Sequence, residues 1–124
     1  MANAYPLARA LAEKYLNGQI VDVSTSSSGW IVVPGQGIIT DAYCAISAAL
    51  TTANGTITIK NGSTTLGTIT LTQVGSAAGS VFTATFTGSE SSRSVKAGDV
   101  IQFATDGACD TTSIGALTMV VKET

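Results

Sequence analysis

Apolar and polar residues alternate along several separate stretches of this chain, and this alternation limits what it can fold into. Thr56–Lys60 reads TITIK and Thr68–Thr72 reads TITLT, so isoleucine and leucine fall on one side and threonine on the other. Val81–Thr87 repeats the pattern with three residues on its apolar side: Phe82, Ala84 and Phe86. A period of two residues is typical of a strand with one buried face, so the pattern predicts an all-β fold.

The first two stretches are separated by a short segment that favours a hairpin. It contains Asn61 and Gly62, which both tolerate the positive φ that a type I′ turn requires. We expect a bulge at Leu66 and Gly67, near the start of the second strand.

Residues 95–121 predict two further strands joined by one polar loop. In the first strand, Ile101 and Phe103 alternate with Gln102. The second strand alternates in the same way through Leu117, Met119 and Val121. A last strand this apolar is expected to close the core, with the earlier strands packed around the pair.

Two strands are expected earlier in the chain. Trp30–Val33 is a short apolar strand that stops at Pro34 and Gly35. Gly37–Ser47 is longer, and one of its faces carries Ile38, Ala42, Cys44 and Ile46. The other face carries Ile39, Asp41 and Tyr43. Because that second set mixes large apolar side chains with a carboxylate, it is typical of an interface rather than of a core or a wetted surface.

Residues 4–17, AYPLARALAEKYLN, form the one segment with a strongly helical pattern. Leu7, Leu11 and Tyr15 recur at four-residue spacing, and Leu16 lies on the adjacent stripe. A helix this short is marginal alone in water, so its apolar stripe is expected to dock. The docking partner is either the chain's own sheet or another subunit or partner lattice.

These elements define the expected organisation. Residues 1–18 form a helical docking arm, and residues 19–124 form a β-domain of about eight strands. Strands with this pattern assemble into a sandwich, a jelly roll or a barrel, which are architectures that protect the edges of a sheet. We predict a jelly-roll-like β-sandwich with a short N-terminal helix. An immunoglobulin-like sandwich is the alternative, and the placement of Trp and Tyr around Cys44 and Cys109 is unlike that fold.

The charge pattern excludes several partners. Charged residues make up 11% of the chain, the net charge is −2, and the few basic residues are scattered. Nucleic-acid binding needs a basic stripe, and no run of residues is long and apolar enough for a membrane, so neither partner is expected. The first sixteen residues contain three charged ones, which argues against a secretion signal. A surface with so little charge favours self-association.

Catalytic chemistry has few candidates in this sequence. Histidine is absent, which removes the commonest general base and metal ligand. Asp99, Asp106 and Asp110 lie close together, and we read them as turn residues in preference to a cation site. Cys44 and Cys109 permit a disulfide, although thiols are the default in a reducing cytosol. We therefore expect no enzyme, cofactor or metal site.

Three stretches resemble the small head-decoration proteins of tailed bacteriophages, also called cement or head-fibre proteins. They are LNGQIVDV at 16–23, PGQGIITDAY at 34–43 and KAGDVIQFATDG at 96–107. The resemblance covers most of the chain from Leu16 onward. It implies a compact β-domain, usually trimeric, that sits on the capsid exterior and clamps neighbouring subunits of the major capsid protein. The resemblance also implies a virion location after assembly in the host cytoplasm.

On this interpretation the chain is a homotrimer, and seven residues are candidates for capsid or subunit contact. They are Leu7, Leu11, Tyr15, Leu16, Trp30, Ile39 and Tyr43. The competing interpretation is a receptor- or carbohydrate-binding module of a viral fibre, which would stack exposed aromatic side chains on a sugar. For that role the chain offers one tryptophan, Trp30, and three scattered tyrosines.

Overall fold

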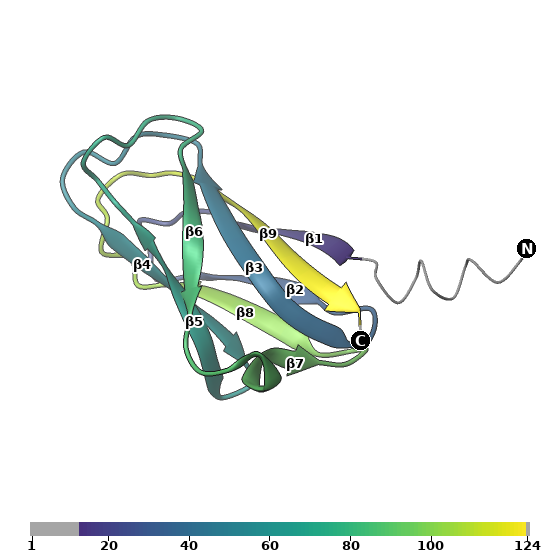
Figure 1. Cartoon of the computed structure of the whole chain (residues 1–124). Helices are drawn as coiled ribbons and strands as arrows, with labels where there is room; N and C mark the ends of the chain where they lie inside the picture. The colour runs from purple at the N-terminus through teal and green to yellow at the C-terminus, as the bar shows by residue number, and fades with distance from the viewer. Residues whose placement is uncertain (1–12, 124) are drawn as a thin grey trace, which may run out of the picture.

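A computed structural model describes residues 13–123, and in that range the fold is all-β (Figure 1). The first strands in chain order are β1 (Glu13–Ile20), β2 (Ser28–Val32), β3 (Gly37–Ile46), β4 (Gly55–Asn61) and β5 (Thr64–Leu71). They are followed by β6 (Val81–Phe86), the 3-10 helix η1 (Glu90–Arg93), β7 (Ser94–Val95), β8 (Val100–Thr105) and β9 (Gly115–Glu123). The prediction of an all-β fold is confirmed.

The strands form one antiparallel sheet that bends back on itself. Its order is β1-β9-β3-β6-β5-β4-β8-β2, and β7 pairs with β3 outside this path. The bend lies at β6, whose first residues pair with β3 and whose last residues pair with β5. We call β1, β9 and β3 the first half, and β5, β4, β8 and β2 the second half. The jelly-roll and immunoglobulin-like topologies both stay predictions.

The two ends of the sheet meet, so it is nearly closed. A Cβ on Gly18 of β1 would lie 2.8 Å from the side chain of Ile31 in β2. A Cβ on Gly29 of β2 would lie 2.5 Å from the carbonyl oxygen of Gln19 in β1. Because both distances are shorter than a real Cβ contact, glycine at these two positions is what lets the edge strands approach.

The core lies between the two halves and is built from the inward side chains of the alternating strands. Ile57, Ile59, Ile69 and Leu71 come from the hairpin, and Ile101 and Phe103 come from β8. Burying one such side chain contributes about 1.5–3 kcal/mol. Phe82, Ala84 and Phe86 of β6 pack against this cluster while partly exposed. The predicted inward faces of these strands are confirmed, although β8 and β9 lie in opposite halves and do not pair with each other.

The predicted hairpin forms, but its turn lies one residue later than expected. Asn61 pairs with Thr64, which leaves Gly62 and Ser63 as the loop. Gly62 has φ +63°, and no residue other than glycine has positive φ in the described part of the chain. Positive φ at the first loop residue alone is the pattern of a type II′ turn, so the type I′ prediction is wrong.

The bulge predicted in the second strand of this hairpin is confirmed. The pairing steps from Ile59 with Gly67 to Lys60 with Thr65, which leaves Leu66 as the extra residue. Leu66 is buried in the core.

The predicted faces of β3 are wrong at one end, because a second bulge changes their phase. The register with β9 shifts between Ile39 and Asp41. One extra residue, Thr40, moves every side chain before it to the opposite face. Ile39 is therefore 0% exposed and belongs to the core, and the prediction that it lies on an outer interface is wrong.

The helix predicted over residues 4–17 is wrong where the structure describes it. Glu13–Ile20 is strand β1, and every one of its residues pairs with β9. This long-range pairing outweighs the local helical pattern, since propensity is a weak prior. Residues 4–12, which include Leu7 and Leu11, lie outside the described part. Because β1 crosses the expected boundary at residue 18, the division into an arm (1–18) and a β-domain (19–124) stays a prediction.

Candidate interaction surfaces

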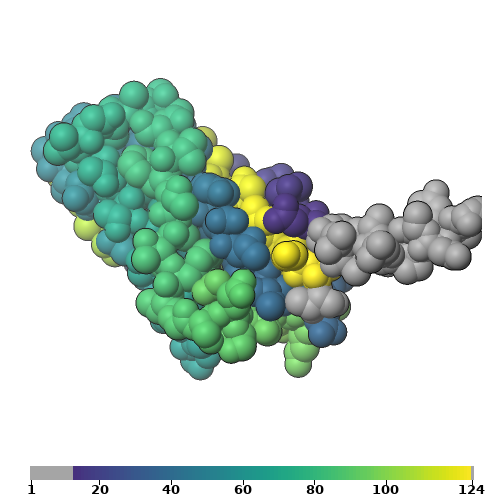
Figure 2. All heavy atoms as spheres, in the orientation of Figure 1, coloured from purple at the N-terminus to yellow at the C-terminus, as the bar shows by residue number. Residues whose placement is uncertain are grey.

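The outer surface of the first half carries two tyrosines on either side of β9. Tyr15 in β1 pairs with Val120, and Tyr43 in β3 pairs with Thr118. Tyr15 is 65% exposed and Tyr43 is half-buried. We call Tyr15, Val120 and Tyr43 the tyrosine face. Figure 2 views this side of the molecule, where β3 (blue), β9 (yellow) and β1 (purple) lie side by side.

Val120 is the centre of the tyrosine face. Met119 and Val121 on either side of it point into the core, so Val120 points outward. It is nevertheless only 6% exposed and is not a member of the core cluster. Val120 is therefore an apolar residue that is almost fully buried on the outer side of the sheet.

Polar contacts hold the rim of the tyrosine face. The Tyr15 hydroxyl donates a hydrogen bond to Glu13 Oε1 at 3.2 Å, and the carboxylate raises the pKa of Tyr15. Thr118 Oγ1 donates to Asn17 Oδ1 at 3.1 Å. On the opposite face of β1, Lys14 Nζ and Glu123 Oε1 form a salt bridge of 3.0 Å.

The outer surface of the second half carries the tryptophan. Trp30 on β2 pairs with Gln102 on β8, and Gln102 pairs with Lys60 on β4. We call Trp30, Gln102 and Lys60 the tryptophan row. Trp30 is 58% exposed, and next to it Val32 and Val100 form a directly paired, exposed apolar corner.

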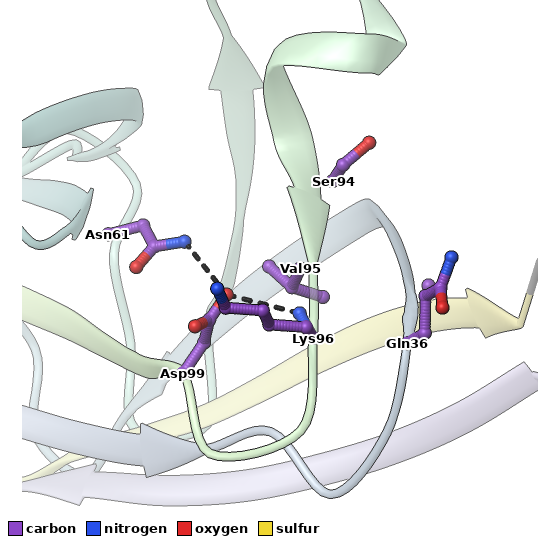
Figure 3. Close-up of a pocket in the computed structure, with 7 residues that line it drawn as sticks. Gln36, Asn61, Ser94, Val95, Lys96 and Asp99 are labelled. Atoms are coloured by element: carbon purple, nitrogen blue, oxygen red, sulfur yellow. Dashed lines mark hydrogen bonds between the residues drawn. The ribbon is translucent and has the colours of Figure 1, made fainter.

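A groove of about 580 Å³ lies at the end of the sheet where the turn after β7 meets β4. Asp99 accepts hydrogen bonds there from Asn61 Nδ2 at 3.3 Å and from the Lys96 backbone N–H at 3.1 Å (Figure 3). Gln36 and Ser94, which also line the groove, point away from Asp99 in the same view. The polar groups serve the turn and do not converge on a ligand.

Two of the three acidic residues that the sequence suggested as turn residues act as such. Asp106 Oδ1 accepts hydrogen bonds from the backbone N–H groups of Thr56 and Ala108, and Asp99 accepts one from the backbone N–H of Lys96. Within residues 13–123, no group of three or more His, Cys, Asp and Glu side chains is placed to hold a metal ion. The same residues include no helix with the length and apolar character needed to cross a membrane.

Cys44 and Cys109 are free thiols, and both are buried. Burial raises the pKa of Cys44 to about 11 and also raises the pKa of Cys109. Because the thiolate is the reactive species, both thiols are chemically quiet at neutral pH. The default expected from the sequence, two thiols, is what the structure has.

The candidate contact residues are distributed over both halves of the sheet. Tyr15 and Tyr43 share the tyrosine face, whereas Trp30 lies on the opposite half. Leu16 points inward and packs against the core while partly exposed. The sequence analysis did not identify Val120 or Lys60 as surface-site residues. The neighbours of each lie on strands that are distant in the chain, and the pairing register between such strands cannot be predicted from a local pattern.

Comparisons with known proteins give distant structural likenesses. No family model matches the chain, and no curated protein sequence matches it. One similar solved structure is the cyanophage Pam1 capsid asymmetric unit, with 16% identity, coverage of 90% of this chain and 83% of that chain, and a TM-score of 0.48. Another is CsCBM6-3 from Clostridium stercorarium in complex with cellobiose, with 16% identity, coverage of 93% and 95%, and a TM-score of 0.42. Neither is similar enough to assign this chain a fold family or a function.

Proposed function

We propose that this chain is a structural virion protein that decorates the exterior of an assembled capsid and stabilises its lattice. The tyrosine face is the docking surface. Tyr15 carries this proposal, since it is 65% exposed on the outer surface and lies beside the apolar Val120 of the adjacent strand. Tyrosines around a desolvated centre are typical of the residues that supply most of the binding energy at protein interfaces. The role is one of binding, with no enzymatic activity.

The sequence resemblance supports the capsid as the partner. Two of the three stretches that resemble head-decoration proteins, residues 16–23 and 34–43, overlap β1 and β3. These are the strands that carry Tyr15 and Tyr43. The resemblance and the tyrosine face thus concern the same half of the sheet, and the major capsid protein is the proposed partner.

The N-terminal residues extend the proposed docking surface. The chain enters the described fold at Glu13, the first residue of β1, which is the edge strand of the same half. Leu7 and Leu11 are therefore proposed to contact the capsid next to Tyr15. Burying two leucines is worth roughly 3–6 kcal/mol in total before the entropy cost of association.

The proposed assembly is a homotrimer, which occupies threefold positions of the capsid with every subunit equivalent. Each docking contact is then weak alone and is strengthened by the other two through effective concentration. The low content of charged residues, 11%, supports a stable association of this chain with other protein subunits. Assembly would take place in the host cytoplasm together with the capsid.

Co-sedimentation with capsids assembled from the major capsid protein tests this function. We expect Tyr15→Ala and Tyr43→Ala each to weaken binding about tenfold, the effect of losing one well-packed aromatic contact. Val74→Ala is the matched control, because Val74 is exposed on the loop between β5 and β6 and is not part of the tyrosine face. Light scattering measures the oligomeric state.

Two results would overturn the proposal at different levels. If the parent chain does not bind capsids, the proposed function is wrong. If the Tyr15 and Tyr43 variants bind as tightly as the Val74 control, the function stands and the docking surface lies elsewhere.

A further inference from the structure

We infer that the tryptophan row is a second binding site, on the opposite half of the sheet from the tyrosine face, and that its ligand is an acidic sugar. Register places its three side chains on neighbouring strands, Trp30 on β2, Gln102 on β8 and Lys60 on β4. Neighbouring strands lie about 4.8 Å apart, so the row spans roughly 10 Å. That length suits one or two sugar rings lying across the strands.

Trp30 supplies the platform of this site. Trp30 lies in the middle of β2 and is 58% exposed, although the fold has a core in which large apolar side chains are buried. The face of an indole ring carries negative charge density, which attracts the polarised C–H groups on one face of a pyranose ring. Sugar-binding sites combine such an aromatic surface with a few fixed polar groups.

Gln102 supplies a fixed polar group beside the platform. Its Nε2 donates a 2.8 Å hydrogen bond to Ser28 Oγ on the neighbouring strand, which holds the amide in one orientation. The amide carbonyl oxygen and the second N–H make no hydrogen bond with another residue in the described range, 13–123. They are therefore available to accept from and donate to sugar hydroxyls.

Lys60 is the residue from which we infer that the ligand carries a negative charge. It is the one charged residue in the four strands of the second half, β2, β4, β5 and β8. The salt bridge of the described region joins Lys14 and Glu123, so Lys60 has no acidic partner there. The ammonium group of this half-buried lysine, in a surface of threonine and glutamine, is electrostatically complementary to one carboxylate, as carried by a sialic or uronic acid.

Titration of the full chain with oligosaccharides tests the site. Sialyllactose and a diglucuronide are the acidic probes, lactose is the neutral probe, and binding is measured by calorimetry and by chemical-shift changes. We expect millimolar or tighter binding of an acidic probe, with lactose bound at least tenfold more weakly. Affinity should fall as salt is raised, because the Lys60 contact lies at the surface.

Variants of Trp30 and Lys60 distinguish the roles of these two residues. Trp30→Ala should abolish binding of both acidic and neutral probes. Lys60→Gln should weaken the acidic probe at least tenfold and leave lactose unchanged, which a purely structural role of Lys60 would not do. Tyr15→Ala, an exposed aromatic on the opposite half, is the matched control and should bind sugars as the parent does.

The failure of this site can be distinguished from that of the proposed function. Lys60→Gln, which changes none of the candidate capsid contacts, should decorate capsids as the parent does. If no acidic probe binds, or if Lys60→Gln binds acidic and neutral probes as the parent does, the inference is wrong. Loss of capsid binding in Trp30→Ala, without sugar binding by the parent, would show instead that Trp30 and the Val32–Val100 corner form a protein interface.

Discussion

Arg93 donates a hydrogen bond from its Nε to the carbonyl oxygen of Ile39, at 2.8 Å, directly beside the bulge in β3. The bulge breaks the regular register with β9 at this point. The same guanidinium group lies 4.9 Å from the centroid of the Phe86 ring in β6. One side chain therefore connects β3 with β6 where the sheet bends from one half to the other.

Replacing Arg93 should destabilise the fold. Arg93→Met keeps much of the aliphatic stem but leaves the Ile39 carbonyl without its donor, so we expect a loss of about 1–3 kcal/mol in the free energy of unfolding. Arg93→Lys retains the charge without an Nε donor and should recover only the cation–π part, about 0.5–1 kcal/mol. Urea denaturation measures both. Equal stability of the parent and Arg93→Met would show that the hydrogen bond contributes nothing.

The hairpin turn predicts a difference between two adjacent loop residues. Gly62→Val forces a β-branched residue to φ +63°, which should cost about 1–3 kcal/mol of stability. Ser63→Ala is the control, because Ser63 has no positive φ, and its effect should stay within about 0.5 kcal/mol. Thermal melting compares the two. A larger effect at Ser63 than at Gly62 would mean that the turn is placed wrongly.

Acid should weaken the fold through Asp22. Its Oδ1 accepts hydrogen bonds from the Ser24 hydroxyl at 2.6 Å and from the Ser24 N–H at 2.9 Å, which lower the pKa of Asp22 below 3.8. A lowered pKa means that this stabilisation is present above pH 3.8 and is lost as the pH falls through the folded-state value. Asp22→Asn should therefore be less stable than the parent at pH 6, with a difference that shrinks in strong acid. Denaturant midpoints from pH 6 to pH 2 measure it, and a constant difference would contradict the assignment.

Two N-terminal deletions should behave differently. Removing residues 1–12 keeps all of β1, so the chain should stay folded, and capsid binding should fall if Leu7 and Leu11 contribute. Removing residues 1–17 deletes more than half of β1 and uncovers β9, so it should lower the melting temperature clearly. Circular dichroism and capsid co-sedimentation distinguish the outcomes. Equal melting temperatures for the two deletions would mean that β1 does not stabilise the sheet.

A milder change tests the docking role of residues 1–12 without shortening the chain. Leu7→Asp and Leu11→Asp should leave the melting temperature unchanged and weaken capsid binding. Arg9→Asp, in the same segment but off the predicted apolar stripe, is the control. If the control weakens binding as much as Leu7→Asp does, charge rather than apolar contact is responsible.

Strands whose alternating pattern is complete within a few residues could be predicted from local sequence alone. Ile57 and Ile59, Phe82 and Phe86, and Leu117 and Met119 all take the inward positions that their period of two predicts. The hairpin and its bulge at Leu66 are likewise local, because a short loop and one extra residue set the register of adjacent segments. Information of this kind lies in neighbouring residues, so a single sequence is enough to read it.

Other features depend on contacts between segments that are far apart in the sequence. Tyr15 lies in a strand because β9, about a hundred residues away along the chain, supplies hydrogen-bond partners that outweigh a local helical pattern. Ile39 is in the core because the bulge at Thr40 shifts the faces of β3 relative to β9. Trp30, Gln102 and Lys60 form one row because β2, β8 and β4 pair side by side when the sheet forms. In each case the deciding contact joins residues distant in sequence, and its free energy appears only once the whole sheet has formed.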